Sequence, residues 1–401
     1  MPAASRCLRP ARRLAAAGAA AACAAGIAGC ASAAAPGGAA ASTNTAQSPA
    51  AHATRPRPAP RAVSAKGLHV DGNRLLDARG HVIVFHGVNR SGTEYACVQG
   101  QGIFDGPATA ASVRAIARWH ANAVRIPLNE SCWLGLHGVP PRFAGARYRR
   151  AVVAYVRLLE RHGLYPMLSL MWGAPGRHPA TYQSGAPDRD HSPSAWRSLA
   201  RTFRHDHDVV LAPWGETVVD ADCFLQGGVC EATYGPRNRP YATAGMQQAV
   251  DVMRGAGYTG VIAIPGVDRA NDLSGWLAHE PRDPLRQLVA EAHVYGDNVC
   301  AATACLDRTL APVAARVPLV LGEVGESVED AGASACGARR VAAIVKWADA
   351  HGAGYDAWAW DAWGTCGALV GDYTGTPHAA YGRWVEAHYS RNRVTPLRVR
   401  R

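Results

Sequence analysis

The sequence predicts an α/β protein, a (β/α)8 TIM barrel preceded by a short N-terminal β-hairpin. Three observations lead to this fold class. Eight short apolar segments alternate with helical stretches after Gly67. Several of these segments are continuous apolar runs, as expected for parallel strands buried on both faces. The 401-residue chain is also long enough for a barrel, which takes roughly 250 residues, together with an N-terminal extension.

The first 30 residues have the pattern of a signal peptide. A basic start, Arg6–Arg13, precedes Leu14–Ile27, an Ala-rich apolar run too short for a permanent membrane helix. The run ends in Ile27-Ala28-Gly29-Cys30, which resembles a bacterial lipobox, where the Cys is lipidated. The alternative is an ordinary cleavage site among small residues. We therefore expect an exported protein, either a cell-surface lipoprotein anchored at Cys30 or a secreted protein.

Residues 31–66 are predicted to form a disordered Ala/Pro-rich linker, since this composition cannot bury a core. Positive charge is concentrated at the two ends of the chain. Eight of the 42 Lys and Arg residues lie in 1–66, and five lie in a basic tail at 391–401. The domain at 67–390 then holds 29 Lys and Arg against 31 Asp and Glu. This nearly neutral balance argues against a nucleic-acid-binding face.

The elements of the domain follow in order. Leu68–Val70 and Arg74–Leu76 flank Asp71-Gly72, a turn pair typical of a hairpin. The predicted strands are Val82–Val88, Ala121–Ile126, Tyr165–Leu170, Val209–Trp214, Gly260–Ile264, Leu288–Val294, Leu319–Gly322 and Tyr355–Trp360. Predicted helices between them include Ser112–Trp119, Tyr148–Arg161, Ala244–Arg254 and Cys336–His351.

Eight of the eleven cysteines lie beyond the linker, and an even number in an exported domain predicts four disulfides. Many pairings are possible. Proximity along the chain favours Cys223–Cys230 and Cys300–Cys305, which leaves Cys97–Cys132 and Cys336–Cys366. No pair has the spacing of a zinc site, so we predict no metal site and expect no cofactor.

Side chains that carry chemistry lie at the carboxyl ends of the strands in such a barrel. Glu216 ends the fourth predicted strand and Glu323 the seventh. Two carboxyl groups suit the cleavage of a glycosidic bond, because one can protonate the leaving oxygen while the other attacks the anomeric carbon or activates water. Other polar and aromatic residues near strand ends are Asn89, Arg125, Trp172, His293, Tyr295, Trp358 and Trp360.

Residues 67–390 resemble glycoside hydrolase family 5, the cellulase family, whose members are retaining (β/α)8 hydrolases. The similar motifs occur in the family's order: Gly87-Val88-Asn89, Trp119–Pro127, His293-Val294-Tyr295, Glu323 and Trp358-Ala359-Trp360. The resemblance implies hydrolysis of an oligosaccharide, polysaccharide or glycoside by double displacement.

The resemblance also implies roles for individual residues. Glu216 would be the acid/base and Glu323 the nucleophile. Arg125 would keep Glu323 ionised, Tyr295 would hydrogen-bond to Glu323, and His293 would lie beside Glu216. Trp360 or Trp358 would form a platform for a sugar ring, with Trp172 as a further candidate for stacking.

Two positions depart from the family pattern. Gly215 precedes Glu216 where the family usually has Asn, and Met171 stands where a His is usual. These differences imply that the sugar is held differently from glucose in a cellulase, or that turnover is poor. The alternative function is therefore a non-catalytic, surface carbohydrate-binding protein on a degenerate hydrolase barrel. For either function we expect a monomer whose partner is a carbohydrate.

Overall fold

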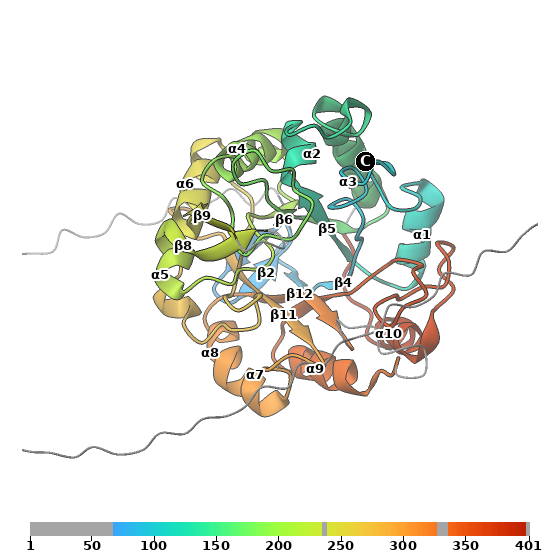
Figure 1. Cartoon of the computed structure of the whole chain (residues 1–401). Coiled ribbons are helices and arrows are strands. Elements are labelled where there is room, and N and C mark those ends of the chain that lie inside the picture. The colour runs from blue at the N-terminus through green and yellow to red at the C-terminus, as the bar shows by residue number, and fades with distance from the viewer. Residues whose placement is uncertain (1–66, 235–238, 327–335, 398–401) are drawn as a thin grey trace, which may run out of the picture. The chain divides into compact units, whose positions relative to one another are not determined.

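The computed structural model describes residues 67–234, 239–326 and 336–397, without the side chains of a few residues in 229–234. The predicted signal peptide, the linker and the last four residues of the predicted tail lie outside the described residues. Eight parallel strands close into a barrel in the order β10-β11-β12-β13-β4-β5-β6-β7, which confirms the predicted fold class (Figure 1).

Each of the eight predicted strands overlaps a barrel strand. The barrel strands are β4 (His86–Asn89), β5 (Ala123–Asn129), β6 (Tyr165–Trp172), β7 (Val210–Ala212), β10 (Ile262–Pro265), β11 (Leu288–Tyr295), β12 (Leu319–Gly325) and β13 (Gly354–Ala357). β7 is shorter than predicted, because Pro213 has no N–H group to continue the ladder. Glu216 therefore lies in the loop beyond β7 rather than directly at a strand end.

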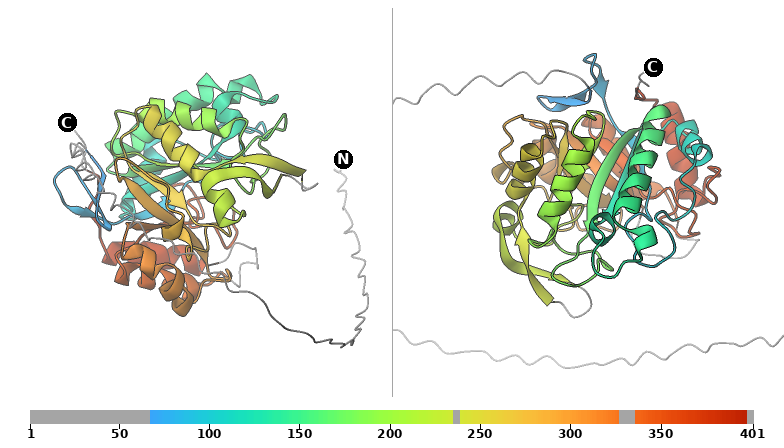
Figure 2. Two further views of the ribbon diagram at one scale, coloured as in Figure 1. Left: turned by 90° about the vertical axis from the view of Figure 1, so that its left-hand side faces the viewer. Right: turned by 90° about the horizontal axis from the view of Figure 1, so that it is seen from above.

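The segment Val82–Val88 contains two strands instead of one. β3 (Val82–Ile83) joins β1 (His69–Asp71) and β2 (Arg74–Leu76) in a three-stranded antiparallel sheet, so the predicted hairpin gains a third strand. Leu68, Leu75 and Ile83 pack with residues from the first positions of the barrel strands. This sheet covers one end of the barrel, and β8 (Gly227–Tyr234) and β9 (Arg239–Ala244) project from the other end (Figure 2).

Helices surround the barrel. They are α1 (Ala110–Arg118), α2 (Glu130–Leu134), α3 (Ala146–Arg161), α4 (Ser192–Phe203), α5 (Ala221–Gln226), α6 (Met246–Gly255), α7 (Thr303–Thr309), α8 (Ala311–Ala314), α9 (Arg339–Ala350) and α10 (Ala379–Arg391). In α3 the buried side chains recur at helical spacing, with Tyr148, Val152, Tyr155 and Leu159 on one face. None of the helices in the described part of the chain is long and apolar enough to span a bilayer.

Three of the four predicted disulfides are present, namely Cys97–Cys132, Cys300–Cys305 and Cys336–Cys366. The fourth, Cys223–Cys230, includes a side chain outside the described residues. Beyond α10 the chain returns to the barrel, where the N–H of Leu397 donates to the carbonyl of Gly163. Residues 392–397, assigned to the basic tail from the sequence, therefore contact the barrel.

Candidate active site

Alternation along β11 directs three polar side chains to the interior of the barrel. Glu291, His293 and Tyr295 are spaced by two residues, so they lie on one face of the strand, and all three are buried. β11 lies beside β12, where His293 is in register with Glu323. The sequence therefore places a buried imidazole and a phenol directly beside the carboxylate of the next strand.

Glu323 is held by two donors. The Nη1 of Arg125 lies 2.8 Å from its Oε1, and the hydroxyl of Tyr295 donates to its Oε2 at 2.6 Å. Burial raises the pKa of Glu323, and the charge of Glu216 adds to this effect, while His293 and Arg125 oppose it. The arrangement leaves the carboxylate fixed in position with 4% of its side chain exposed.

Glu216 is held by donors from two other elements. The Nδ1 of His293 lies 3.0 Å from its Oε1, and Nε2 of Gln183 donates to its Oε2 at 2.6 Å. Burial alone would raise the pKa of Glu216, but the hydrogen bond and charge of His293, the Gln183 amide and the charge of Arg269 outweigh burial and lower it. With 14% of its side chain exposed, Glu216 is the more accessible of the two glutamates.

The two glutamates lie close together. One carboxylate oxygen of each, and a ring nitrogen of His293, all lie within 4.8 Å of one another. Burial would lower the pKa of His293, but the charge of Glu323 and hydrogen bonds to Glu216 and Glu291 raise it to about 9. The raised pKa favours the imidazolium form of His293, whose Nδ1 lies beside Glu216 and whose Nε2 lies 3.2 Å from both Glu291 and Arg125.

Arg125 connects the polar groups beneath the mouth. Its Nε donates to Glu291 at 2.9 Å and its Nη1 to Asn89 at 3.0 Å. Its pKa is raised, because the charges of Glu291 and Glu323 outweigh the effect of burial, so it stays charged. The amide of Asn89 in turn donates to the carbonyl of Gly322 at 2.8 Å, which ties β4 to the strand that carries Glu323.

Gly215 and Met171 occupy one shared space. A Cβ atom added at Gly215 would overlap the Sδ of Met171 and would lie 3.0 Å from Nη2 of Arg125. The Sδ of Met171 lies 3.5 Å from the same Nη2. The thioether thus fills the volume that a side chain at position 215 would need, so the two departures from the family pattern are one structural feature.

The aromatic predictions have mixed outcomes. Trp360 is fully buried, with its ring centroid 4.8 Å from that of Trp119, so the preference for Trp360 as a sugar platform is corrected. The cause is that β13 ends at Ala357, so Trp358 and Trp360 do not share a strand face. Trp358 is half-buried, and its ring centroid lies 6.4 Å from that of the exposed Trp363. Trp172 is also half-buried, and its ring centroid lies 6.4 Å from that of Tyr95.

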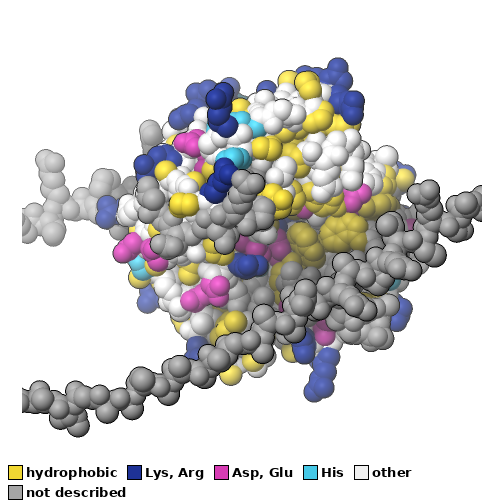
Figure 3. Space-filling model, viewed as in Figure 1, with side chains coloured by type: hydrophobic (Ala, Val, Ile, Leu, Met, Phe, Trp, Pro, Cys, Tyr) yellow, Lys and Arg dark blue, Asp and Glu magenta, His cyan; other side chains and the backbone are white. Residues whose placement is uncertain are grey.

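Sequence reasoning missed several neighbours of the two glutamates. Glu291 could have been found from its spacing of two residues before His293. Gln183 and Arg269 lie in long loops after β6 and β10, and their sequence carried no signal of proximity to Glu216. Figure 3 views the mouth and shows acidic side chains and a Lys or Arg side chain together near the middle of this face, beside hydrophobic side chains.

Two clusters have the composition of a cation site, Glu216–His293–Glu323 and Glu130–Asp188–His191. In the first cluster both ring nitrogens of His293 are already engaged, Nδ1 with Glu216 at 3.0 Å and Nε2 with Glu291 at 3.2 Å. In the second cluster Glu130 and Asp188 accept from the backbone of Ala174, and Nδ1 of His191 lies 2.8 Å from the carbonyl of Ala174. These contacts fit a hydrogen-bonded network better than a set of free ligands.

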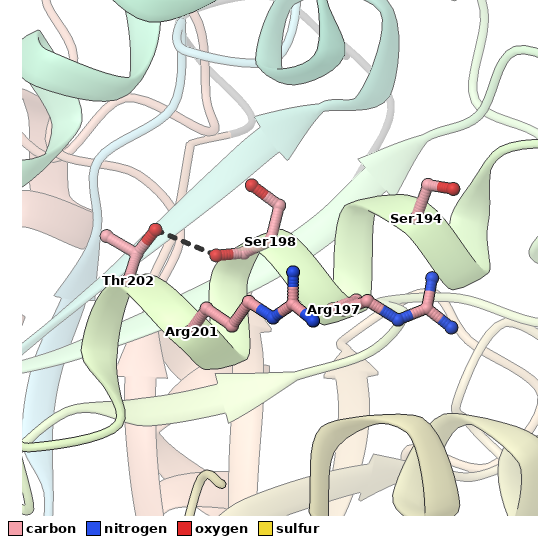
Figure 4. Close-up of a pocket in the computed structure, with 5 residues that line it drawn as sticks. All are labelled: Ser194, Arg197, Ser198, Arg201 and Thr202. Atoms are coloured by element: carbon pink, nitrogen blue, oxygen red, sulfur yellow. Dashed lines mark hydrogen bonds between the residues drawn. The ribbon is translucent and has the colours of Figure 1, made fainter. Parts of the chain in front are cut away.

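A separate pocket of about 410 Å³ lies on the outer face of α4 (Figure 4). Its lining consists of Ser194, Arg197, Ser198, Arg201 and Thr202. Neither glutamate of the mouth contributes to it.

Comparison with known proteins decides the family. The family model for cellulase, glycosyl hydrolase family 5, matches residues 76–364. The chain belongs to this family. It is therefore a glycoside hydrolase, as the sequence resemblance implied. Among curated proteins, a mannan endo-1,4-beta-mannosidase of Streptomyces lividans is 24% identical over 309 residues, which cover 74% of this chain and 67% of that protein.

Solved structures agree on the fold of this family 5 chain. A β-glucanase from Saccharophagus degradans has a TM-score of 0.59 and 19% identity, covering 84% of this chain and 98% of its own. The catalytic domain of a mannanase from Streptomyces sp. SirexAA-E has a TM-score of 0.58 and 20% identity, covering 87% and 98%. At this level of sequence identity, the similarity shows a shared barrel fold and nothing finer.

Proposed function

We propose that this family 5 protein hydrolyses a glycoside by double displacement, with Glu216 as general acid/base and Glu323 as nucleophile. The observation that carries the proposal is the pair of carboxylates whose oxygens lie within 4.8 Å, held by different donors. Retaining glycosidases place the two carboxyl groups about 5–5.5 Å apart, whereas inverting enzymes leave a wider gap for water.

In the first step Glu323 attacks the anomeric carbon while Glu216 protonates the leaving oxygen, so that a covalent glycosyl ester forms as the glycosidic bond breaks. In the second step Glu216 removes a proton from water, which attacks the anomeric carbon and releases Glu323. Arg125 and Tyr295 stabilise the carboxylate of Glu323 before the first step and again as the second step releases it. The proton for the first step is shared between Nδ1 of His293 and Glu216, which are 3.0 Å apart.

The substrate class follows from the relatives. The curated relative is named for mannan and the structural relatives for mannan and β-glucan. We propose a β-linked glycan or glycoside of this general kind, acted on outside the cell, where the three disulfides are stable.

Substitution of each glutamate tests the proposal. The full chain, Glu216→Ala and Glu323→Ala are assayed on β-mannan, β-glucan and a panel of aryl pyranosides and furanosides. Loss of the general acid should lower turnover by about 10²–10⁴-fold, and loss of the nucleophile should stop it. Glu280→Ala is the matched control, since Glu280 is exposed and lies far along the chain from both glutamates. A Glu323→Ala variant as active as the parent contradicts the proposal.

A second function is favoured by one observation, the thioether that fills the wall beside Glu216. A non-catalytic carbohydrate-binding protein would bind glycans without turning them over. In that case binding, measured by calorimetry, would be unchanged in Glu216→Ala and no substrate of the panel would be cleaved by the parent.

A further inference from the structure

The loop after β10 contains an unusual backbone. Asp268, Arg269 and Ala270 have φ angles of 49°, 57° and 61°, so three consecutive residues other than glycine are left-handed. Each such residue costs about 1–2 kcal/mol relative to the right-handed conformation. Strained backbone of this kind persists where the surroundings fix it, and it concentrates at functional sites.

Backbone hydrogen bonds fix this turn to the loop that carries Glu216 and to strand β11. The N–H of Arg269 donates to the carbonyl of Thr217, the residue after Glu216, at 2.6 Å. The N–H of His293 donates to the carbonyl of Ala270 at 2.9 Å. Val267 and Asp272 close the base of the turn with two bonds of 3.0 Å. The turn is therefore held rigidly beside the acid/base.

This turn carries one cation, Arg269, whose charge acts on Glu216. The side chain of Arg269 is exposed and has no hydrogen bond or ion pair with any of the residues that the structure describes. It lies near enough to Glu216 for its charge to act on that carboxylate, yet it forms no ion pair with it. An unpaired Arg held in place by strained backbone is suited to bind an anion.

The order of the strands places the loop of Arg269 next to the loop of Glu216. β7 lies between β6 and β10 in the barrel. Gln183, from the loop after β6, and Arg269, from the loop after β10, therefore flank Glu216 on its two sides, while Glu323 lies on β12. Because Glu216 would protonate the leaving oxygen, a charged side chain beside Glu216 is within reach of the leaving group.

We propose that Arg269 forms a binding site for an anionic substituent, a carboxylate or a sulfate, on the leaving group, so that the substrate is an acidic glycan or glycoside. This inference rests on the proposed function. It has a chemical consequence for the acid step. The positive charge of Arg269 opposes protonation of Glu216, and an anion bound to Arg269 neutralises that charge when the acid is needed.

Matched leaving groups test the inference. For a glycosyl group that the panel shows to be cleaved, kcat and KM are measured for the 4-nitrophenyl glycoside and for analogues that carry a carboxylate or a sulfonate on the ring. Arg269→Gln should lower kcat/KM for an anionic analogue on the order of tenfold more than for the neutral glycoside. Comparison of the effect on the carboxylate analogue with the effect on the sulfonate analogue distinguishes a carboxylate site from a sulfate-type site. The matched control is Arg197→Gln, an exposed Arg on the outer face of α4 (Figure 4).

The ratio of anionic to neutral kcat/KM separates the possible outcomes. The inference is supported if this ratio falls in Arg269→Gln and stays unchanged in Arg197→Gln. In the parent, the ratio should also fall with added salt, because salt screens the charge of Arg269. If Arg269→Gln changes all substrates equally, Arg269 only tunes Glu216 and the inference is overturned. If no glycoside is cleaved by the parent, the proposed function fails instead.

Discussion

At the scale of single residues, the contact between Gly215 and Met171 explains why the chain has no side chain before Glu216. The Cβ of any larger residue would overlap the thioether, and Nη2 of Arg125 limits movement on the other side. The same thioether lies near the guanidinium that holds Glu323. Packing at this point therefore couples the positions of both glutamates.

The first prediction concerns this shared space. Gly215→Asn should destabilise the protein by about 1–3 kcal/mol through overpacking and lower kcat. In the double variant Met171→Ala/Gly215→Asn the overlap is removed, so part of the stability should return as a coupling of about 0.5–3 kcal/mol. Denaturant unfolding and kinetics of Gly215→Asn, of Met171→Ala and of the double variant measure both effects. A single Gly215→Asn variant as stable as the parent contradicts the geometry.

The second prediction concerns pH. In the proposed mechanism Glu323 must be ionised, and burial raises its pKa, so the acid limb of kcat/KM should lie above pH 4.5. Activity also needs the proton shared by Glu216 and His293, whose pKa is about 9, so the alkaline limb should fall near that pH. In His293→Asn the proton resides on Glu216 alone, and the alkaline limb should move down by more than one pH unit. An unchanged alkaline limb in His293→Asn would remove His293 from the account.

At the scale of elements, the loop at 173–191 positions Gln183 against Glu216. Buried carboxylates brace this loop, because Asp188 accepts from the N–H of His191 at 2.7 Å and from that of Ala174 at 3.2 Å. The pKa of Glu130 is raised well above its ordinary value by burial and by the charge of Asp188. Burial would raise the pKa of Asp188, but its hydrogen bonds, foremost that to His191, lower it, so the proton of the pair is favoured on Glu130.

The third prediction follows from this bracing. Asp188→Ala removes the acceptor of the His191 N–H and one of the two acceptors of the Ala174 N–H, and should cost about 1–3 kcal/mol of local stability. Trypsin should then cleave more rapidly at the exposed Arg177 and Arg189, and kcat should fall as Gln183 loses its position. Asp190→Ala is the matched control. Asp190 is exposed, and within the described residues the N–H of Gly176 is the one backbone donor to its carboxylate. If trypsin cleaves Asp188→Ala and Asp190→Ala at the same rate, Asp188 does not brace the loop.

The strands could be predicted from the sequence because apolar runs report burial on both faces, and every barrel strand was found in this way. The positions of Glu216, Glu323, Arg125, His293 and Tyr295 followed from strand order. Trp360 was misjudged because period-two alternation was extended past the end of β13. Gln183 and Arg269 could not be found, since they reach Glu216 through loops whose course depends on tertiary hydrogen bonds.

At the scale of the whole molecule, the disulfides fasten the outer segments to the barrel. Cys97 lies in the loop after β4 and Cys132 in α2, a separation of 35 residues, whereas Cys300 and Cys305 are five residues apart. The entropy that a disulfide removes from the unfolded chain grows with the length of the loop it closes.

The fourth prediction uses this difference. Replacing Cys97 and Cys132 by Ser should lower the free energy of unfolding by about 4 kcal/mol, and replacing Cys300 and Cys305 by about 2 kcal/mol. Guanidinium unfolding of the two double variants measures the difference. If loss of Cys97–Cys132 lowers the free energy of unfolding no more than loss of Cys300–Cys305, the disulfides act mainly on the native state rather than on the unfolded chain.

The most direct test of the central assignment is the site of the covalent intermediate. The full chain is incubated with an activated 2-deoxy-2-fluoro glycosyl fluoride of a sugar that it cleaves, and the labelled peptide is identified by mass spectrometry. The account predicts one glycosyl group per chain, attached to Glu323. A label on Glu216, or inactivation that leaves Glu323 unmodified, would contradict it.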